Sequence, residues 1–397
     1  MAYRKILHLD LDAFFCAVEE LHDPSLRGTA FAVGGKPDQR GVVSSCSYAA
    51  RQFGVRSALP MSQAVRMCAN LVIRPPNFKA YRAASEQVMT RLNNLTPFVE
   101  QISIDEAFMD VTMLPDNAET IARRLQAQIN AELGLPCSLG VAANKLVAKI
   151  ANNIGKERAG KDKPPNAILV IPPGQEAAFL APLGTRELWG VGPKTAEQLA
   201  KFGIKTIGDI ARYPENKLIR QFGKHGEELA QRSKGIDNRP VETEGEAKSV
   251  SKETTFSQDV RDAETLKRTL RGLADGVGRQ LRKNELSGTT IKIKLRWSDF
   301  TTLTRQVTLN QPTQHDNEIY EAALDLFTKA WPKGRAVRLI GVGVSSFEGG
   351  AFQPTLWDAP RPPQDNRLES VLDALRDRFG EGVVKRGSDL LADENGD

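Results

Sequence analysis

A short, mostly apolar run near the N-terminus ends at an acidic residue. Ile6, Leu7, His8 and Leu9 precede Asp10. Such a run is typical of a strand that is buried on both faces of a sheet. Asp12 follows two residues later, so in an extended strand it would share a face with Asp10. The chain is therefore expected to begin with a buried strand that delivers carboxylates at its carboxyl end.

A second acidic pair lies between two short strand-like runs, 99–104 and 107–111. If these runs join the same sheet, Asp105 and Glu106 come close to Asp10. Three clustered carboxylates cannot all stay ionised without a cation. Oxygen ligands suit Mg²⁺, and two such ions support an in-line displacement at phosphorus. The pattern predicts a site for two Mg²⁺ ions, although any one of these acids could equally be a solvated turn residue.

The order of elements predicts an α+β sandwich in the N-terminal part of the chain. Helical spacing, glycine and proline breaks and apolar runs indicate helices at 13–21, 48–53, 60–68, 79–95, 118–133 and 144–153, and strands at 41–45 and 138–143. We expect the helices to lie on one face of an antiparallel sheet.

The 397 residues exceed the size of one ordinary core, so several domains are expected. Residues 176–233 read as short helices separated by glycines, and 238–246 as a polar linker. Residues 248–347 form a separate α+β unit. An amphipathic helix is expected at 367–379, ending at Gly380.

Charge and cysteine usage narrow the class of protein. Residues 351–397 carry a net charge of −4 and the rest of the chain +9, which fits a nucleic-acid or nucleotide partner as well as a merely soluble protein. The four cysteines form no Cys-x-x-Cys pair, which argues against zinc and for a reducing compartment. With neither a secretory signal nor a membrane-spanning run, a cytoplasmic protein without membrane contact is expected.

Basic and aromatic residues near the acids suggest a triphosphate pocket. Tyr48 and Arg51 are three residues apart and would face the same way on a helix. Lys156, Lys161 and Lys163 are expected in the loop after the helix at 144–153. Of the adjacent pair Phe14 and Phe15, one ring should enter the core and the other should lie near the metals, where it could exclude a 2′-hydroxyl. Each residue alone reads equally well as surface or core.

Four segments together resemble one family. They are Leu-Asp-Leu-Asp-Ala-Phe-Phe-Cys-Ala-Val-Glu at 9–19, Ser-Tyr-Ala-Ala-Arg-Gln-Phe-Gly-Val-Arg-Ser at 47–57, Ser-Ile-Asp-Glu-Ala-Phe-Met-Asp-Val at 103–111, and the segment 140–151. They resemble motifs of the Y-family DNA polymerases of the DinB type, over about 3–347. The resemblance implies a template-directed, translesion DNA polymerase with primer–template DNA and dNTP as substrates. Its expected architecture is a right hand with a ferredoxin-like palm, small fingers, a helical thumb and an α+β little finger.

The resemblance also assigns the domains. The palm is expected at 1–12 and 78–165, the fingers at 13–77, the helix-hairpin-helix thumb at 166–237, the linker at 238–247, the little finger at 248–347 and a tail at 348–397.

By the same resemblance, Asp10, Asp105 and Glu106 are the catalytic metal ligands, with the backbone carbonyl of Leu11. Asp10 and Asp105 would bridge both ions and Glu106 would hold the catalytic one. Asp12 matches the family's metal ligand less well than Asp10, because that ligand is the first Asp of the pair.

The remaining pocket residues also follow from the family. Phe15 is expected to be the sugar steric gate, and Tyr48 and Arg51 would contact the triphosphate. The family places its phosphate lysine in Lys-Pro-Asn-Gly. The nearest match here, Lys-Pro-Pro-Asn at 163–166, favours Lys163 over Lys156.

Two segments are candidates for DNA binding. Gly190, Gly192 and Lys194 look like a helix-hairpin-helix turn, in which backbone N–H groups can approach a phosphate; the segment 222–226 is a weaker second example. Lys292, Lys294 and Arg296 alternate with apolar residues on one strand and would give it a basic, sequence-independent face. An ordinary helical turn and an ordinary amphipathic strand remain alternatives.

The tail carries Gln353, Leu356 and Trp357, which resemble the bacterial sliding-clamp motif.

Small fingers imply low fidelity, and the sequence shows no room for a proofreading nuclease. We expect a monomer. Two alternatives remain: a haloacid-dehalogenase-type phosphatase, against which the residues after Asp12 count, and a catalytically silent DNA-binding scaffold.

Overall fold

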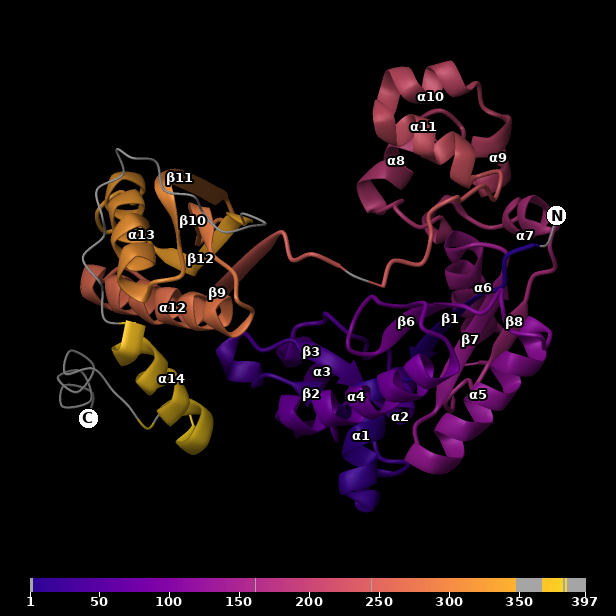
Figure 1. Cartoon of the computed structure of the whole chain (residues 1–397), viewed down its shortest axis with the longest axis horizontal. Coiled ribbons are helices and arrows are strands. Elements are labelled where there is room, and N and C mark those ends of the chain that lie inside the picture. Colours follow the sequence, from indigo (N-terminus) through magenta and orange to yellow (C-terminus); the bar gives the residue numbers. More distant parts are fainter. Residues whose placement is uncertain (1–2, 161, 244, 348–365, 381–382, 384–397) are drawn as a thin grey trace. The chain divides into compact units, whose positions relative to one another are not determined.

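The computed structural model describes residues 3–160, 162–243, 245–347, 366–380 and 383 (Figure 1). The chain divides into two compact units, Met1–Gly245 and Glu246–Asp397. Within the described residues, no helix is long and apolar enough to cross a membrane.

A five-stranded sheet forms the centre of the first unit, in the order β5-β6-β1-β7-β8. The strand β1 lies between β6 and β7 and is antiparallel to both, whereas β8 is parallel to β7. This topology contradicts the phosphatase alternative, because an α/β fold of that type would place β1 among parallel strands. The strand bounds are β1 Ile6–Leu11, β5 Val99–Gln101, β6 Glu106–Asp110, β7 Cys137–Ala142 and β8 Ile168–Val170.

Helices cover both faces of this sheet, so the prediction of helices on one face was wrong. Leu7, Leu9 and Leu11 of β1 pack in one core cluster with α4 (Phe78–Leu95) and α5 (Ala118–Leu133). On the opposite face, Ile6 packs with α6 (Lys145–Arg158) and the thumb helices. A parallel connection from β7 to β8 needs a crossover, and α6 supplies it. The strand β8 also lies beyond residue 165, where the predicted palm ended.

The fingers segment contains a small sheet of its own, in the order β3-β2-β4. It packs against two short helices around a separate apolar cluster. The sequence predicted both helices and β3 but missed β2 and β4, which are too short to show periodicity. The elements are α1 Phe14–His22, β2 Phe31–Gly34, β3 Val43–Cys46, α2 Tyr48–Gln52, α3 Met61–Met67 and β4 Val72–Arg74.

Five short helices follow β8, as the glycine-punctuated pattern predicted. Their apolar residues share a core cluster with α6. The helices are α7 Glu176–Leu180, α8 Pro193–Lys201, α9 Ile207–Arg212, α10 Glu215–Phe222 and α11 Lys224–Arg232.

The second unit is the expected α+β domain, with a sheet in the order β11-β10-β12-β9. Ile291, Ile293 and Leu295 pack against the helices, as predicted, while Lys292 is exposed and Lys294 partly exposed. Its elements are β9 Ser249–Val260, α12 Ala263–Lys283, β10 Gly288–Trp297, β11 Thr302–Thr313, α13 Asp316–Ala330, β12 Val337–Phe347 and α14 Asn366–Phe379.

Candidate active site

The backbone brings the two acidic segments together, as predicted. Asp10 lies directly opposite Glu106 in the β1–β6 pairing. The amide N–H of Leu11 donates to the carbonyl of Asp105 at 2.9 Å. The three acidic residues therefore lie at one end of two adjacent antiparallel strands.

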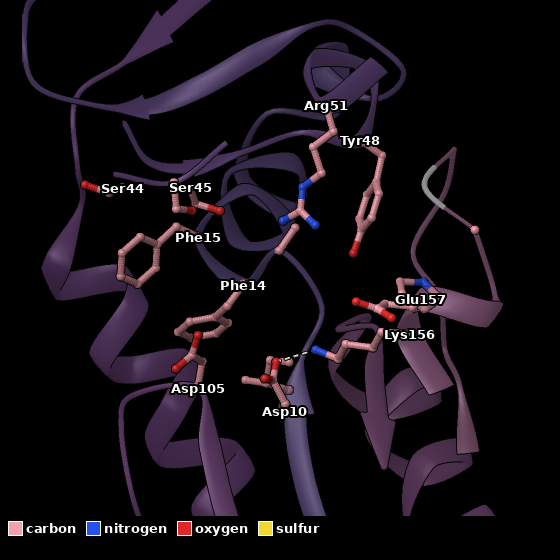
Figure 2. Close-up of a pocket in the computed structure, with 15 residues that line it drawn as sticks. Asp10, Phe14, Phe15, Ser44, Ser45, Tyr48, Arg51, Asp105, Lys156 and Glu157 are labelled. Carbon is pink, nitrogen blue, oxygen red and sulfur yellow. Dashed lines mark hydrogen bonds and ion pairs between the residues drawn. The ribbon is translucent and has the colours of Figure 1, made fainter. Parts of the chain in front are cut away.

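Each of the three carboxylates already has a local partner. The ammonium of Lys156 lies 2.5 Å from Asp10 Oδ1, an ion pair drawn as a dashed line in Figure 2. Glu106 Oε2 lies 2.5 Å from Lys149 Nζ and 3.3 Å from His8 Nε2. Asp105 Oδ1 accepts a hydrogen bond from the Ser103 hydroxyl. Two of the acids are thus neutralised by lysines from one helix, α6.

Burial and these partners move the pKa values in opposite directions. Burial raises the pKa of Asp10, and the nearby acids add to this effect although Lys156 opposes it. The hydrogen bond from His8, together with Lys149, lowers the pKa of Glu106 to about 2. Burial lowers the pKa of His8 to about 4, so the imidazole is neutral at physiological pH.

Asp12 does not belong to this group of partly buried acids. Its side chain is buried, and its carboxylate accepts hydrogen bonds from the Ser138 hydroxyl at 2.9 Å and the Asn166 backbone N–H at 3.0 Å. It also lies 3.0 Å from the ammonium of Lys156. These contacts tie β1 to β7 and to the loop before β8, which indicates a structural role.

The residue types are those a hard divalent cation requires, since three acidic residues lie at one end of the sheet and carboxylate oxygens suit such an ion. The side chains themselves are turned toward their local partners. Among the residues that the structure describes, no three His, Cys, Asp or Glu side chains are close enough together to hold a metal ion. For Asp10 and Asp105 to hold an ion, their carboxylates would have to exchange Lys156 and Ser103 for it.

A cavity of about 310 Å³ opens beside these acids. Figure 2 shows Tyr48 and Arg51 reaching into it from the side opposite Asp10 and Lys156. The guanidinium of Arg51 lies 4.6 Å from the centre of the Tyr48 ring. The cavity thus has an acidic floor and a basic, hydroxyl-bearing wall.

The two adjacent phenylalanines differ in burial, although both line the cavity. Phe14 is 3% exposed and belongs to the core, whereas Phe15 is only partly buried, and both rings line the cavity. The Phe15 ring stacks on Tyr81 with centres 4.3 Å apart and meets Phe78 edge-on at 6.1 Å. These two ring contacts therefore fix the position of Phe15 at the cavity wall.

The structure places Lys156, rather than Lys163, in this cavity. Lys163 lines a neighbouring cavity of about 430 Å³, beyond Asp12 and Tyr48. The prediction that Lys156 lies in a loop was wrong, because α6 continues to Arg158. The apolar spacing continues to Ile154 and would have extended the helix, placing Lys156 two turns after Lys149.

The turn proposed for DNA binding has the backbone that its glycines allow. Gly190 has a φ of +100°, and Gly192 is the N-cap of α8, whose second residue is Lys194. Only a short 3₁₀ turn, Thr185–Glu187, precedes this turn. At the second candidate, α10 and α11 are joined through Gly223, with a φ of +61°.

Known proteins share both the sequence and the fold. Residues 9–153 match the impB/mucB/samB family, 247–356 match the C-terminal domain of that family, and 186–237 match the thumb domain of DNA polymerase-iota. DNA polymerase IV of Desulfatibacillum aliphaticivorans is 42% identical and covers 97% of this chain and 96% of its own. DNA polymerase IV of Streptomyces coelicolor is 45% identical over 86% of this chain and 71% of its own.

Solved structures of Y-family DNA polymerases superpose on this chain. A Y-family DNA polymerase chimera, Dbh-Dpo4(243-245)-Dbh, superposes with a TM-score of 0.76 at 27% identity, covering 86% of this chain and 99% of its own. An insertion ternary complex of Dbh DNA polymerase gives a TM-score of 0.60 at 25% identity, with the same coverage.

The fold and the site define a DNA-directed DNA polymerase of right-hand architecture. The chain belongs to the Y family of these enzymes, in the DinB branch whose curated members are called DNA polymerase IV. It is a translesion polymerase, and its family depends on divalent metal ions. The silent-scaffold alternative is therefore wrong.

Proposed function

We propose that the chain extends a primer by two-metal nucleotidyl transfer, with Asp10, Asp105, Glu106 and the carbonyl of Leu11 as the Mg²⁺ ligands. The observation that carries this proposal is the register of β1 and β6, which puts Asp10 opposite Glu106. Two Mg²⁺ ions would activate the primer 3′-hydroxyl and stabilise the leaving pyrophosphate. The protein supplies the fixed carboxylates and the cavity that orients the nucleotide.

Substrate selection follows from the opposite walls of the cavity. Tyr48 and Arg51 would bind the triphosphate of the incoming dNTP, since a hydroxyl and a fork-shaped cation suit phosphate oxygens. Phe15 would act as the steric gate against a 2′-hydroxyl. The sequence named Lys163 as the phosphate lysine; because Lys156 lies in the same cavity as Arg51, we propose Lys156 instead.

The other elements would hold the DNA and a partner. Gly190, Gly192 and Lys194 are proposed to bind a phosphate, and Lys292, Lys294 and Arg296 to follow the backbone without reading sequence. The motif at 353–357, which lies outside the described residues, is proposed to bind a sliding clamp. A cytoplasmic monomer of low fidelity without proofreading fits these assignments.

A primer-extension assay tests the proposed site. Asp105→Ala and Glu106→Ala should each lower the extension rate by at least about 10²-fold, as expected when a group that stabilises transition-state charge is removed. Lys163→Ala, outside the cavity, is the matched control and should extend normally. Wild-type extension by either acidic variant would disprove the assignment.

A further inference from the structure

The carboxylate of Glu106 is held at one of its two oxygens. In the part of the chain that the structure describes, both side-chain contacts of this group reach Oε2: Lys149 Nζ at 2.5 Å and His8 Nε2 at 3.3 Å. Both partners belong to the α6 side of the sheet. Two donors on one oxygen leave Oε1 as the oxygen that can bind a cation.

The hydrogen-bond network of Asn152 fixes the tautomer of His8. Asn152 Nδ2 lies 3.2 Å from the carbonyl of His8 and 3.0 Å from that of Ser138. Carbonyls only accept hydrogen bonds, so the amide nitrogen must face them, and it then lies 3.0 Å from His8 Nδ1. A proton on Nδ1 would point at an NH₂ group. The proton of the neutral ring is therefore on Nε2, which donates to Glu106.

Tight packing prevents the ring from following the carboxylate if it moves. His8 is fully buried, and its ring centre lies 4.7 Å from that of Phe108. At Gly140, a Cβ atom would collide with the carbonyl of Ala148 and the backbone nitrogen of Asn152, so the backbone of α6 lies directly against the sheet there. This approach is what lets Asn152 reach β1. By contrast, Lys149 has a flexible side chain that could follow Glu106 to several positions.

We propose that His8, with its tautomer fixed by Asn152, is a positioning residue that holds Glu106 Oε2 and presents Oε1 to the catalytic metal. The inference rests on the proposed metal role of Glu106. Hydrogen-bonding partners of a metal ligand typically change metal affinity by 10- to 100-fold when they are removed. The expected effect of losing the His8 donor is therefore weaker metal binding with little change in the affinity for DNA.

The tautomer can be measured on the wild-type protein. Long-range ¹H–¹⁵N correlation spectra report which ring nitrogen of a histidine is protonated, and the chain has only four histidines. The His8 signals are assigned by their absence in His8→Gln. At pH 7.5 without metal, we expect a neutral ring with its proton on Nε2. A proton on Nδ1, or on both nitrogens, would overturn the proposal.

Metal affinity is measured separately by the paramagnetic resonance signal of free Mn²⁺, without substrates. His8→Phe keeps an aromatic ring beside Phe108 but removes the donor, and it should weaken Mn²⁺ binding by about 10-fold. It should raise the Mg²⁺ concentration for half-maximal extension equally. His8→Gln retains an N–H donor and should recover most of the loss.

Ile6→Val is the matched control, because Ile6 is fully buried on the same face of β1 and pairs with Asp110 and Ala142, at the other end of the strand from Asp10. It should lower the melting temperature but leave Mn²⁺ binding unchanged. Unchanged Mn²⁺ binding in folded His8→Phe refutes the proposal. If that variant does not fold, the proposal is tested by the Mn²⁺ affinity of His8→Gln, which should be close to that of the wild type, and by the tautomer of His8 in the wild-type protein. Full extension by Glu106→Ala would refute the metal role of Glu106 instead, which separates the two failures.

Discussion

Lys156 lies in the last turn of the palm helix α6 and Lys163 follows that helix, but only Lys156 lines the cavity that contains Asp10 and Arg51. We expect Lys156→Ala to raise the KM for dNTP by about 10- to 100-fold, because a hydrogen bond to a charged group is lost. Steady-state single-nucleotide insertion measures this change. An increase confined to Lys163→Ala would restore the assignment made from the sequence.

Phe15 is held against the cavity wall by its stack on Tyr81. Replacing it with Val leaves room for a 2′-hydroxyl, so incorporation of ribonucleotides should rise by about 10- to 100-fold relative to dNTP. Competitive insertion of rATP and dATP opposite template T gives the ratio. If the ratio is unchanged while dNTP insertion is normal, another residue forms the gate.

Glu106 should make stability depend on pH in the acidic range. Its pKa in the folded state is about 2, below the ordinary value of 4.5. A lowered pKa stabilises the fold above 4.5, and this contribution is lost as the pH falls toward 2. In EDTA, Glu106→Gln should therefore cost roughly 1–3 kcal/mol of unfolding free energy at pH 7. Urea titrations should show the difference from wild type shrinking below pH 4.5.

At the residue level, the sequence could predict which acids meet but not what their side chains contact. The apolar run before Asp10 and the two runs that flank Asp105 and Glu106 defined three strands, and pairing those strands was enough to bring the acids together. The lysines that neutralise Asp10 and Glu106 come from a helix whose face and length the pattern did not determine. Ion pairs between segments about 40 to 150 residues apart depend on tertiary packing, which local periodicity does not report.

The elements most often missed were the short strands. β2, β4 and β8 have three or four residues each, too few to distinguish an alternating pattern from a buried apolar run. By contrast, the helical spacing alone predicted α5 at its observed bounds; in the structure Asn117 caps its start and Gly134, with a φ of +65°, ends it. A long apolar stripe of helical spacing is therefore enough to define a helix, whereas a strand of three residues leaves no such signal.

The helix α14 was predicted as an amphipathic helix ended by Gly380, and the structure confirms it. Ion pairs from its acidic residues attach it to α12. Arg282 of α12 contacts Asp373 at 2.8 Å and Glu369 at 3.2 Å, and also the buried Asp316 at 2.8 Å. Val371 and Phe379 remain more than half exposed.

We expect Arg282→Met to destabilise the little finger by about 3 kcal/mol, since it leaves buried carboxylates without their cation. Hydrogen exchange measured by mass spectrometry should show faster exchange in α14 and at the start of α13. Lys294→Met, which breaks the exposed pair with Glu253, is the matched control and should cost less than about 1 kcal/mol. Equal exchange in both variants would mean that α14 is held by other contacts.

At the scale of the whole molecule, the boundary between the two units was well predicted. The polar run 238–246 was read as a linker, and the structure divides at Gly245 and Glu246. The sequence could find this boundary because a composition change is local. How the units cooperate on DNA depends on the substrate, which no pattern within the chain encodes.

The clamp motif gives a prediction that involves the whole assembly. Changing Gln353 and Leu356 to Ala should abolish stimulation by a sliding clamp and leave unassisted extension within about 2-fold, because neither residue belongs to the proposed catalytic or DNA-binding sites. Primer extension with and without a loaded clamp measures both values. Loss of unassisted extension would indicate a folding defect rather than lost docking.

The lysines of α6 have a consequence for the enzyme between encounters with substrate. Lys145, Lys149 and Lys156 are paired with Glu100, Glu106 and Asp10, so the acidic end of the sheet carries its own counterions. Chelators should therefore leave the melting temperature almost unchanged, so that the metal-free protein stays folded. On the proposed mechanism, the fold would not depend on magnesium, and the metal ions that arrive with a nucleotide would replace the lysines as counterions of Asp10 and Glu106.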